Sequence, residues 1–180
     1  MRASFINKAP DDWLKDIGED PPKIKEVLGS FVAGSALKVC LYRADHLFLR
    51  FHGPKSSRRI YKPNYWVDGS VLADALARAA QFEGFLTDQE IARVAKTYFR
   101  ELAAICQNWN PLKDTELWKI ELRGREVLQG LEGPIAAQPT FAATATDPAT
   151  SSILRGGGIQ VYLDPKTPFI CTPLNWGAVA

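Results

Sequence analysis

Apolar residues recur at helical spacing in three stretches of the chain. The first, at 21–34, opens with two prolines, which suit the first turn of a helix. The second, at 68–84, begins with Asp68, Gly69 and Ser70, which can cap a helix. The third, at 87–108, begins with a capping box from Thr87 to Glu90 and has the most regular i, i+3, i+4, i+7 pattern. We therefore expect three helices.

Shorter stretches of apolar and β-branched residues lie between and after these helices. Two of them, at 37–43 and 47–51, are separated by only a few residues, and the pattern predicts that they pair as a hairpin. Further strands are expected at 117–122, 159–163 and 169–172. The order helix, strands, helices, strands does not alternate as in a Rossmann or barrel fold, so we predict an α+β fold class.

Length and composition are those of one compact domain. The chain has 180 residues, 46% of them hydrophobic, which is enough for one core. We expect residues 1–35 to form an N-terminal helical segment and residues 36–180 to form the domain that carries the function. The cysteines Cys40, Cys106 and Cys171 stand far apart among apolar residues, which favours buried thiols in a reducing compartment.

The charge balance argues against some kinds of partner. The chain carries 22 Lys and Arg against 20 Asp and Glu, a net charge of +2, so no strong field draws it to nucleic acid or to an anionic membrane. Its start lacks the apolar stretch of a signal peptide, and no apolar run is long enough to cross a bilayer. We expect neither a membrane nor a nucleic acid as partner.

Two pairs of residues are candidates for binding a charged or aromatic ligand. Tyr42 and Arg43 end a predicted strand, where a guanidinium can hold a diphosphate or a ribose by forked hydrogen bonds. The alternative is an ion pair of Arg43 with an acid such as Asp45. Tyr65 and Trp66 follow a basic loop and offer rings that can stack on nicotinamide or adenine. The alternative for this pair is packing in the core.

A run of glycines leads into the strand predicted at 159–163. Gly157 and Gly158 lack a Cβ, so the backbone there can approach a ligand closely, and Gln160 places an amide donor and acceptor at the mouth of the strand. The alternative is a simple turn, since the run lacks the sequence of a phosphate loop. The two histidines, His46 and His52, have no ligand partners at metal-site spacing, so we expect no metal.

The order of these motifs is similar to that of a known family. Tyr-Arg on an early strand, Tyr-Trp before a helix, Trp-Asn followed by Leu-Trp-Lys-Ile-Glu-Leu, and a late Gly-Gly-Gly-Ile-Gln-Val-Tyr-Leu together resemble the ADP-ribosyltransferase-like toxin domains of bacterial polymorphic and secretion-system effectors. The likeness covers about residues 36–172. The glutamine after the glycine run resembles most the NAD glycohydrolase branch, which includes the tuberculosis necrotizing toxin.

The resemblance implies an ADP-ribosyltransferase-like fold, with N-terminal helices and a split antiparallel sheet around an NAD cleft. In that family an early-strand arginine holds the NAD, aromatic rings flank the nicotinamide, and a late-strand Gln or Glu engages the ribose. The site residues expected here are catalytic Gln160 and Arg43, and binding residues Tyr42, Arg43, Tyr65, Trp66, Gly157 and Gly158.

One departure from the family pattern bears on the reaction. Transferases that modify arginine carry Glu-x-Glu where this chain has Gly158-Ile159-Gln160. A neutral carboxamide can orient the ribose but cannot help to activate an acceptor, which favours hydrolysis. We expect an NAD glycohydrolase toxin that cleaves the nicotinamide–ribose bond of NAD or NADP, with no cofactor besides this substrate.

Two alternatives stay open at this stage: transfer of ADP-ribose to a protein or nucleic acid, and a non-catalytic binding module. The family further implies a cognate immunity protein as partner. It also implies action in the cytoplasm of a target cell after delivery by a specialised secretion system.

Overall fold

The computed structural model of the chain describes residues 4–43, 45–52, 65–105, 116–122, 128–144, 146, 148–149, 151–164, 166 and 169–174. The helices and strands in these ranges follow one another as β1 (Ser4–Ile6), α1 (Pro10–Asp16), α2 (Pro21–Gly29), β2 (Lys38–Tyr42), β3 (Phe48–His52), β4 (Tyr65–Asp68), α3 (Gly69–Ala80), α4 (Asp88–Leu102), β5 (Glu116–Leu122), β6 (Leu128–Pro134), β7 (Gln138–Pro139), β8 (Ile153–Leu154), β9 (Ile159–Leu163) and β10 (Phe169–Leu174). The α+β class is confirmed.

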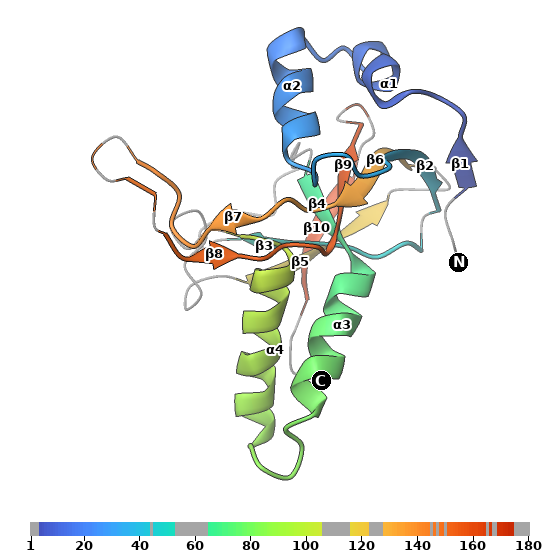
Figure 1. The fold of residues 1–180 in the computed structure, drawn as a ribbon. Helices are drawn as coiled ribbons and strands as arrows, with labels where there is room; N and C mark the ends of the chain where they lie inside the picture. The colour runs from blue at the N-terminus through green and yellow to red at the C-terminus, as the bar shows by residue number, and fades with distance from the viewer. Residues whose placement is uncertain are drawn as a thin grey trace.

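Eight strands form one antiparallel sheet in the order β1-β2-β6-β9-β4-β3-β5-β10, and β7 and β8 form a separate ribbon that projects from it (Figure 1). The predicted hairpin of β2 and β3 is wrong, because β6, β9 and β4 lie between these two strands. β2 pairs instead with β1 and β6, so that Val39 lies opposite Ile6 on one side and Leu131 on the other. The alternation of apolar residues predicted both strands correctly but not their partners, which are distant in sequence.

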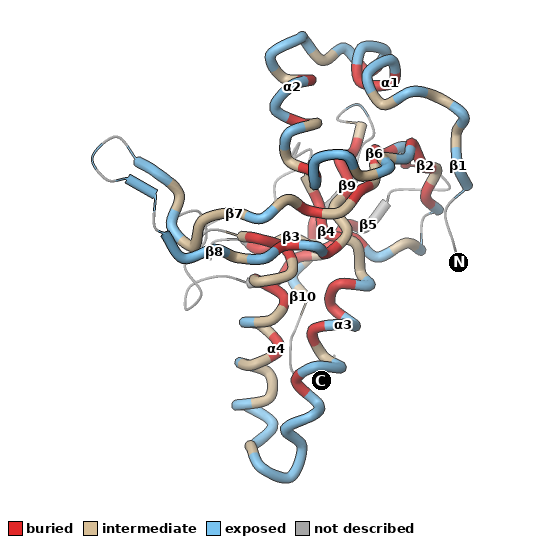
Figure 2. Tube along the Cα trace, in the orientation of Figure 1, coloured by how far each residue is buried: buried red, intermediate tan, exposed pale blue. Residues whose placement is uncertain are grey.

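Helices cover the sheet in two groups. The N-terminal helices α1 and α2 pack in one apolar cluster with strand residues such as Val39, Leu131 and Tyr162. The antiparallel pair α3 and α4 packs in a second cluster with residues such as Phe51 and Val67, and extends away from the sheet to an exposed tip (Figures 1 and 2). The N-terminal residues therefore belong to the same packed body as the sheet, through both β1 and the two helices.

A third cluster lies on the opposite side of the strands. Because successive strand residues face opposite sides, Val161 and Leu163 enter this cluster while Tyr162 between them faces the N-terminal helices. Residues from β2, β6, β9, β4, β3, β5 and β10 all contribute to it, so the sheet curls around this core. Cys40 and Cys171 are buried here, and burial raises the pKa of each thiol to about 11. Cys106 lies outside the described residues.

The three predicted helices are confirmed, and their caps explain where they begin. The Asp20 carboxylate accepts from the Lys23 N–H at the start of α2. Asp68 does the same for the Ser70 N–H at the start of α3. The capping box of Thr87 and Glu90 is formed at α4. Among the helices in the described ranges, none combines the length and the apolar character that crossing a membrane requires.

The sheet is split between β3 and β4. These strands share only the pairs Phe48–Asp68 and Leu49–Val67, after which β3 continues along β5 and β4 continues along β9. The shared end is held tightly: the Gly69 N–H donates to the Leu47 carbonyl at 2.8 Å, and a Cβ on Gly69 would lie 2.9 Å from the Cβ of Leu47. Beyond Leu49 and Val67 the two strands separate, and this separation positions the candidate site.

Candidate functional site

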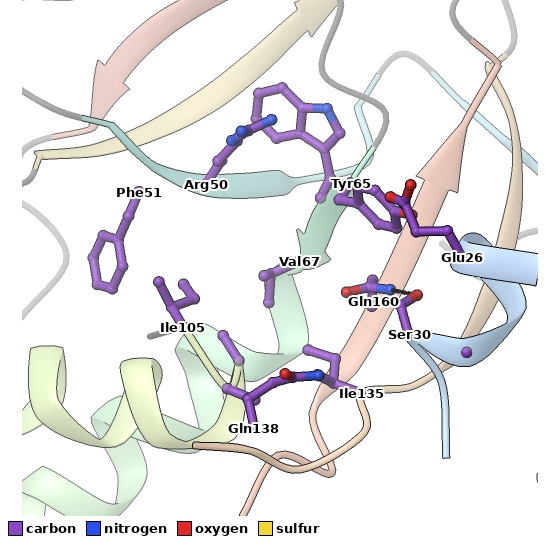
Figure 3. Close-up of a pocket in the computed structure, with 14 residues that line it drawn as sticks. Glu26, Ser30, Arg50, Phe51, Tyr65, Val67, Ile105, Ile135, Gln138 and Gln160 are labelled. Carbon is purple, nitrogen blue, oxygen red and sulfur yellow. Dashed lines mark hydrogen bonds between the residues drawn. The ribbon is translucent and has the colours of Figure 1, made fainter. Parts of the chain in front are cut away.

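A cavity of about 490 Å³ opens where β3 and β4 separate (Figure 3). Arg50 and Phe51 of β3 form one wall. Tyr65, Trp66 and Val67 of β4 form the facing wall, together with Gln160, whose register partner on β4 is Val67. The volume lies within the range of small-molecule sites.

The other walls come from helix ends and from the segment after β6. Glu26 and Ser30 stand at the C-terminal end of α2, and residues 103–105 follow the end of α4. Ile135 and Gln138 close the side next to the β7–β8 ribbon. The cavity thus joins parts of the chain that are far apart in sequence, including the N-terminal segment.

The split gives the cavity access to both sides of the sheet. Phe51 and Val67 belong to the cluster under α3 and α4, whereas Trp66 belongs to the cluster on the opposite side. Arg50 alternates with Phe51 along β3, so its guanidinium leaves the strand on the Trp66 side. One cavity therefore presents a cation and aromatic rings together, with hydrogen-bonding groups on the β9 side.

Glu26 places a negative charge at the rim of the cavity. Its Oε1 accepts from the Tyr65 hydroxyl at 3.1 Å and from the Lys23 ammonium at 2.6 Å. The hydrogen bond from Lys23 lowers the pKa of Glu26; burial opposes this shift and the Tyr65 hydroxyl adds to it. Burial, followed by the charge of Glu26, raises the pKa of Tyr65. At neutral pH the pair is therefore a carboxylate and a protonated phenol.

The Tyr65 ring has a fixed orientation. It packs edge-on against Tyr162 with ring centroids 4.9 Å apart, and the Lys23 ammonium lies 5.3 Å from its centroid. The Tyr162 hydroxyl in turn donates to Glu19 at 2.7 Å, which ties the ring pair to the N-terminal segment. Tyr65 thus forms a firm side of the cavity.

Gln160 reaches the cavity from β9 on the same side of the sheet as Tyr65. Its Nε2 donates to the Ser30 hydroxyl at 2.7 Å. In Figure 3 the carboxamide oxygen points away from Ser30, toward the interior of the cavity. Arg50 lines the cavity from the other side of the split, and in Figure 3 its guanidinium points away from Gln160.

The structure brings three of the expected site residues together and leaves the others apart. Tyr65, Trp66 and Gln160 all line the cavity. Arg43 is exposed just after β2 and is not among the described residues that line it. On β6 the partner of Tyr42 is Leu128 and the partner of Gln160 is Gly133. These two β6 positions are separated by roughly 17 Å of strand, so Arg43 and Gln160 do not meet in one cleft.

Tyr42 also lies elsewhere, in the core. It is 0% exposed in the cluster that also contains Trp66, it is not among the described residues that line the cavity, and its hydroxyl donates to Glu132 at 2.9 Å. Its ring packs on Phe48 and His46, with centroids 4.9 and 4.7 Å away. The expectation that Tyr42 binds a ligand is therefore corrected: burial and a satisfied hydroxyl leave it no surface for one.

The glycine run forms a turn that packs against the protein. The amides of Gly156, Gly157 and Gly158 donate to the carbonyls of Glu101, Ile135 and Leu102 at 3.1, 2.9 and 3.0 Å. Gly156 and Gly157 have positive φ angles of 69° and 83°, which glycine adopts without strain. Gly157 and Gly158 are absent from the described cavity lining, so the structure does not place them beside Tyr65, Trp66 and Gln160.

Sequence reasoning missed the cation of the cavity and its N-terminal wall. Arg50 carries a signal that could have found it, because it is the one charged residue in the apolar stretch Leu-Phe-Leu-Arg-Phe. A charge in a buried strand needs a partner or an open space. Glu26 and Ser30 carry no such signal, because nothing local links a helix end to strand residues that lie 39 and 130 positions further along the chain.

Comparisons with known proteins do not assign this cavity: no family model, curated protein or solved structure matches the chain. Within the part of the chain that the structure describes, no group of three or more His, Cys, Asp or Glu is placed to hold a metal ion.

Proposed function

We propose that this cavity binds NAD or NADP and that the chain is an NAD glycohydrolase, which cleaves the nicotinamide–ribose bond. The observation that carries this proposal is that Arg50, a set of aromatic residues and Gln160 line one cavity at a split in an antiparallel sheet. We further propose that the split sheet is an ADP-ribosyltransferase-like arrangement, with Arg50 in the role expected of Arg43.

Arg50 binds the diphosphate in this proposal. A guanidinium presents two parallel N–H donors to phosphate oxygens and keeps its charge at all physiological pH values. Arg50 is half-buried in a cavity with Phe51 and Trp66 in its walls, where an ionic hydrogen bond is stronger than in open water. Arg43 is exposed and is not among the described residues that line the cavity.

The aromatic residues bind the nicotinamide. Tyr65 is half-buried and offers its ring to the cavity, and Phe51 and Trp66, each only 1% exposed, complete the apolar walls. Stacking against such rings holds a flat heterocycle and excludes water from the bond that breaks. Nicotinamide leaves with the bonding electron pair, and the ribose becomes a cation.

The polar side of the cavity acts on this cation. The Gln160 oxygen accepts hydrogen bonds from ribose hydroxyls and so fixes the sugar. The Glu26 carboxylate, ionised at neutral pH, stabilises the positive charge that develops on the ribose. Water then adds to the cation and releases a proton, which gives ADP-ribose. Neither Gln160 nor Glu26 has to activate a protein acceptor, so hydrolysis is the simplest outcome.

Such an activity would deplete a cell of NAD. It fits a toxin that acts in the cytoplasm of a target cell after delivery by a specialised secretion system. We expect the producing cell to need an immunity protein that blocks the cavity.

The test is nicotinamide release from NAD and from NADP by the purified protein, measured by chromatography. Q160A should remove most of the activity, whereas Q81A, which makes the same change at an exposed helix cap, should keep it. ADP-ribose in solution indicates hydrolysis, and label from NAD on macromolecules of a lysate indicates transfer instead. No release from the wild type with either nucleotide, together with thermal stabilisation by NAD, would leave only a binding module.

A further inference from the structure

Ser30 is the C-terminal cap of α2, and backbone hydrogen bonds fix its position beside Gln160. The Ser30 carbonyl accepts from the Ala136 N–H at 3.0 Å. One residue earlier, the Ile135 N–H donates to the Gly158 carbonyl at 2.8 Å, just before β9 begins. The same short segment after β6 therefore holds both the end of α2 and the start of the strand that carries Gln160.

The Ser30 hydroxyl has only one proton, and that proton is in use. Its Oγ donates to the Val27 carbonyl at 2.7 Å, within the last turn of α2. Toward Gln160 the hydroxyl can then act only as an acceptor. The Gln160 group that faces Ser30 must be the donating Nε2, and the two are 2.7 Å apart.

We infer that Ser30 is a positioning residue, which fixes the Gln160 carboxamide with its oxygen toward the cavity. A flipped carboxamide would bring its oxygen against the Ser30 oxygen with no proton between them, unless the hydroxyl gave up its bond to Val27. The inference rests on the proposed function, in which the ligand presents ribose hydroxyls. A carboxamide oxygen accepts from such hydroxyls, whereas a flipped amide group would only offer them donors.

This role makes the N-terminal segment part of the site. The sequence predicts a functional domain that starts at residue 36, yet the group that orients Gln160 lies at residue 30. The path from Val27 through the Ser30 hydroxyl to Gln160 consists of two short hydrogen bonds. Anything that displaces α2 would therefore release the Gln160 side chain as well.

The chain offers a matched control for this idea. Ser35 makes the same local contacts as Ser30: its Oγ donates to the Val32 carbonyl at 2.7 Å, and its N–H donates to the same oxygen at 3.1 Å. It is not one of the described residues that line the cavity. S35A therefore removes an equivalent back-bond without touching Gln160.

The experiment compares nicotinamide release by the wild type, S30A, S30T and S35A. S30A should lower kcat/KM by roughly fivefold to tenfold, the value of one neutral hydrogen bond. S30T keeps the hydroxyl and should stay within about twofold of the wild type, as should S35A. In a Q160A background, S30A should cause no further loss, because no carboxamide remains to be oriented.

A spectroscopic measurement separates positioning from general damage. The side-chain NH₂ signals of Gln160, assigned by their loss in Q160A, should move in S30A and stay in S35A. Unchanged activity and unchanged NH₂ signals in S30A, or an equal loss of activity with and without Gln160, would overturn the inference. If the wild type itself releases no nicotinamide, the proposed function fails, and this result is distinct from an active wild type that S30A leaves unaffected.

Discussion

Replacing Arg50 by alanine tests which arginine of the chain binds the substrate. The change removes the only described guanidinium in the cavity lining and leaves Phe51 and the strand pairing of β3 with β5 in place. A hydrogen bond to a charged group contributes about 1.5–3 kcal/mol, and each 1.4 kcal/mol corresponds to about a factor of ten. We expect R50A to lower kcat/KM by roughly 10-fold to 150-fold.

Two further variants, R50K and R43A, are controls for R50A. R50K keeps the positive charge but not the fork of two donors, so we expect a loss of roughly tenfold, smaller than that of R50A. R43A removes the exposed arginine after β2 and should change kcat/KM by less than about twofold.

The assay is the initial rate of nicotinamide release over a range of NAD concentrations. Thermal unfolding of each variant serves as the control for folding. The reasoning is refuted if R43A loses activity while R50A keeps it, or if R50K and R50A are both equal to the wild type.

Three other changes probe the rim, the glycine turn and the joint of the sheet. E26Q removes the rim carboxylate and should lower kcat about tenfold with little change in KM, as a loss of transition-state charge stabilisation does. Because the pKa of Glu26 lies below its ordinary 4.5, the wild-type rate should hold down to that pH and fall below it, while the E26Q profile stays flat there. G156A forces a Cβ to within 2.6 Å of the Ile135 carbonyl oxygen at a φ of 69°, and should lower the free energy of unfolding by roughly 1–3 kcal/mol in a urea titration. D68N should cost about 1 kcal/mol at pH 7, because an amide can still cap α3 but makes only a neutral hydrogen bond with His46. Burial acts to raise the pKa of Asp68, but the hydrogen bonds from His46 and Ser70 lower it overall, so its contribution is complete above 3.8 and is lost as the pH falls below that value. The difference in unfolding temperature between the wild type and D68N should therefore shrink in acid.

Local signals in the sequence were sufficient for the helices and for several strands. The capping box at Thr87 and Glu90 and the periodic residues after it define α4, because caps and amphipathic spacing act within a few residues. β6 gave no such signal, since Gly130 and Gly133 interrupt it. The structure explains both glycines: a Cβ on Gly130 would lie 2.5 Å from the Val161 side chain, and one on Gly133 would lie 2.4 Å from Leu37. These constraints come from neighbours that are distant in sequence.

In the candidate site, too, local signals predicted some residues, whereas contacts between distant segments determined the others. Gln160, Tyr65 and Trp66 were found from their local setting, at the start of a strand and after a basic loop, and all three line the cavity. Arg43 was chosen because it ends a strand, but the register of β2 on β6 places it away from Gln160. The single charge of Arg50 in an apolar stretch could have marked it, but register depends on pairing between distant segments, so no local pattern shows which arginine shares a cavity with Gln160.

The short joint between β3 and β4 has a mechanical consequence. Two residue pairs connect a five-strand part of the sheet, β1-β2-β6-β9-β4, to a three-strand part, β3-β5-β10. Gln160 belongs to the first part and Arg50 to the second. A dinucleotide held by both side chains would act as a non-covalent cross-link between the two parts. Its binding should therefore slow the exchange of backbone amide hydrogens in both parts of the sheet.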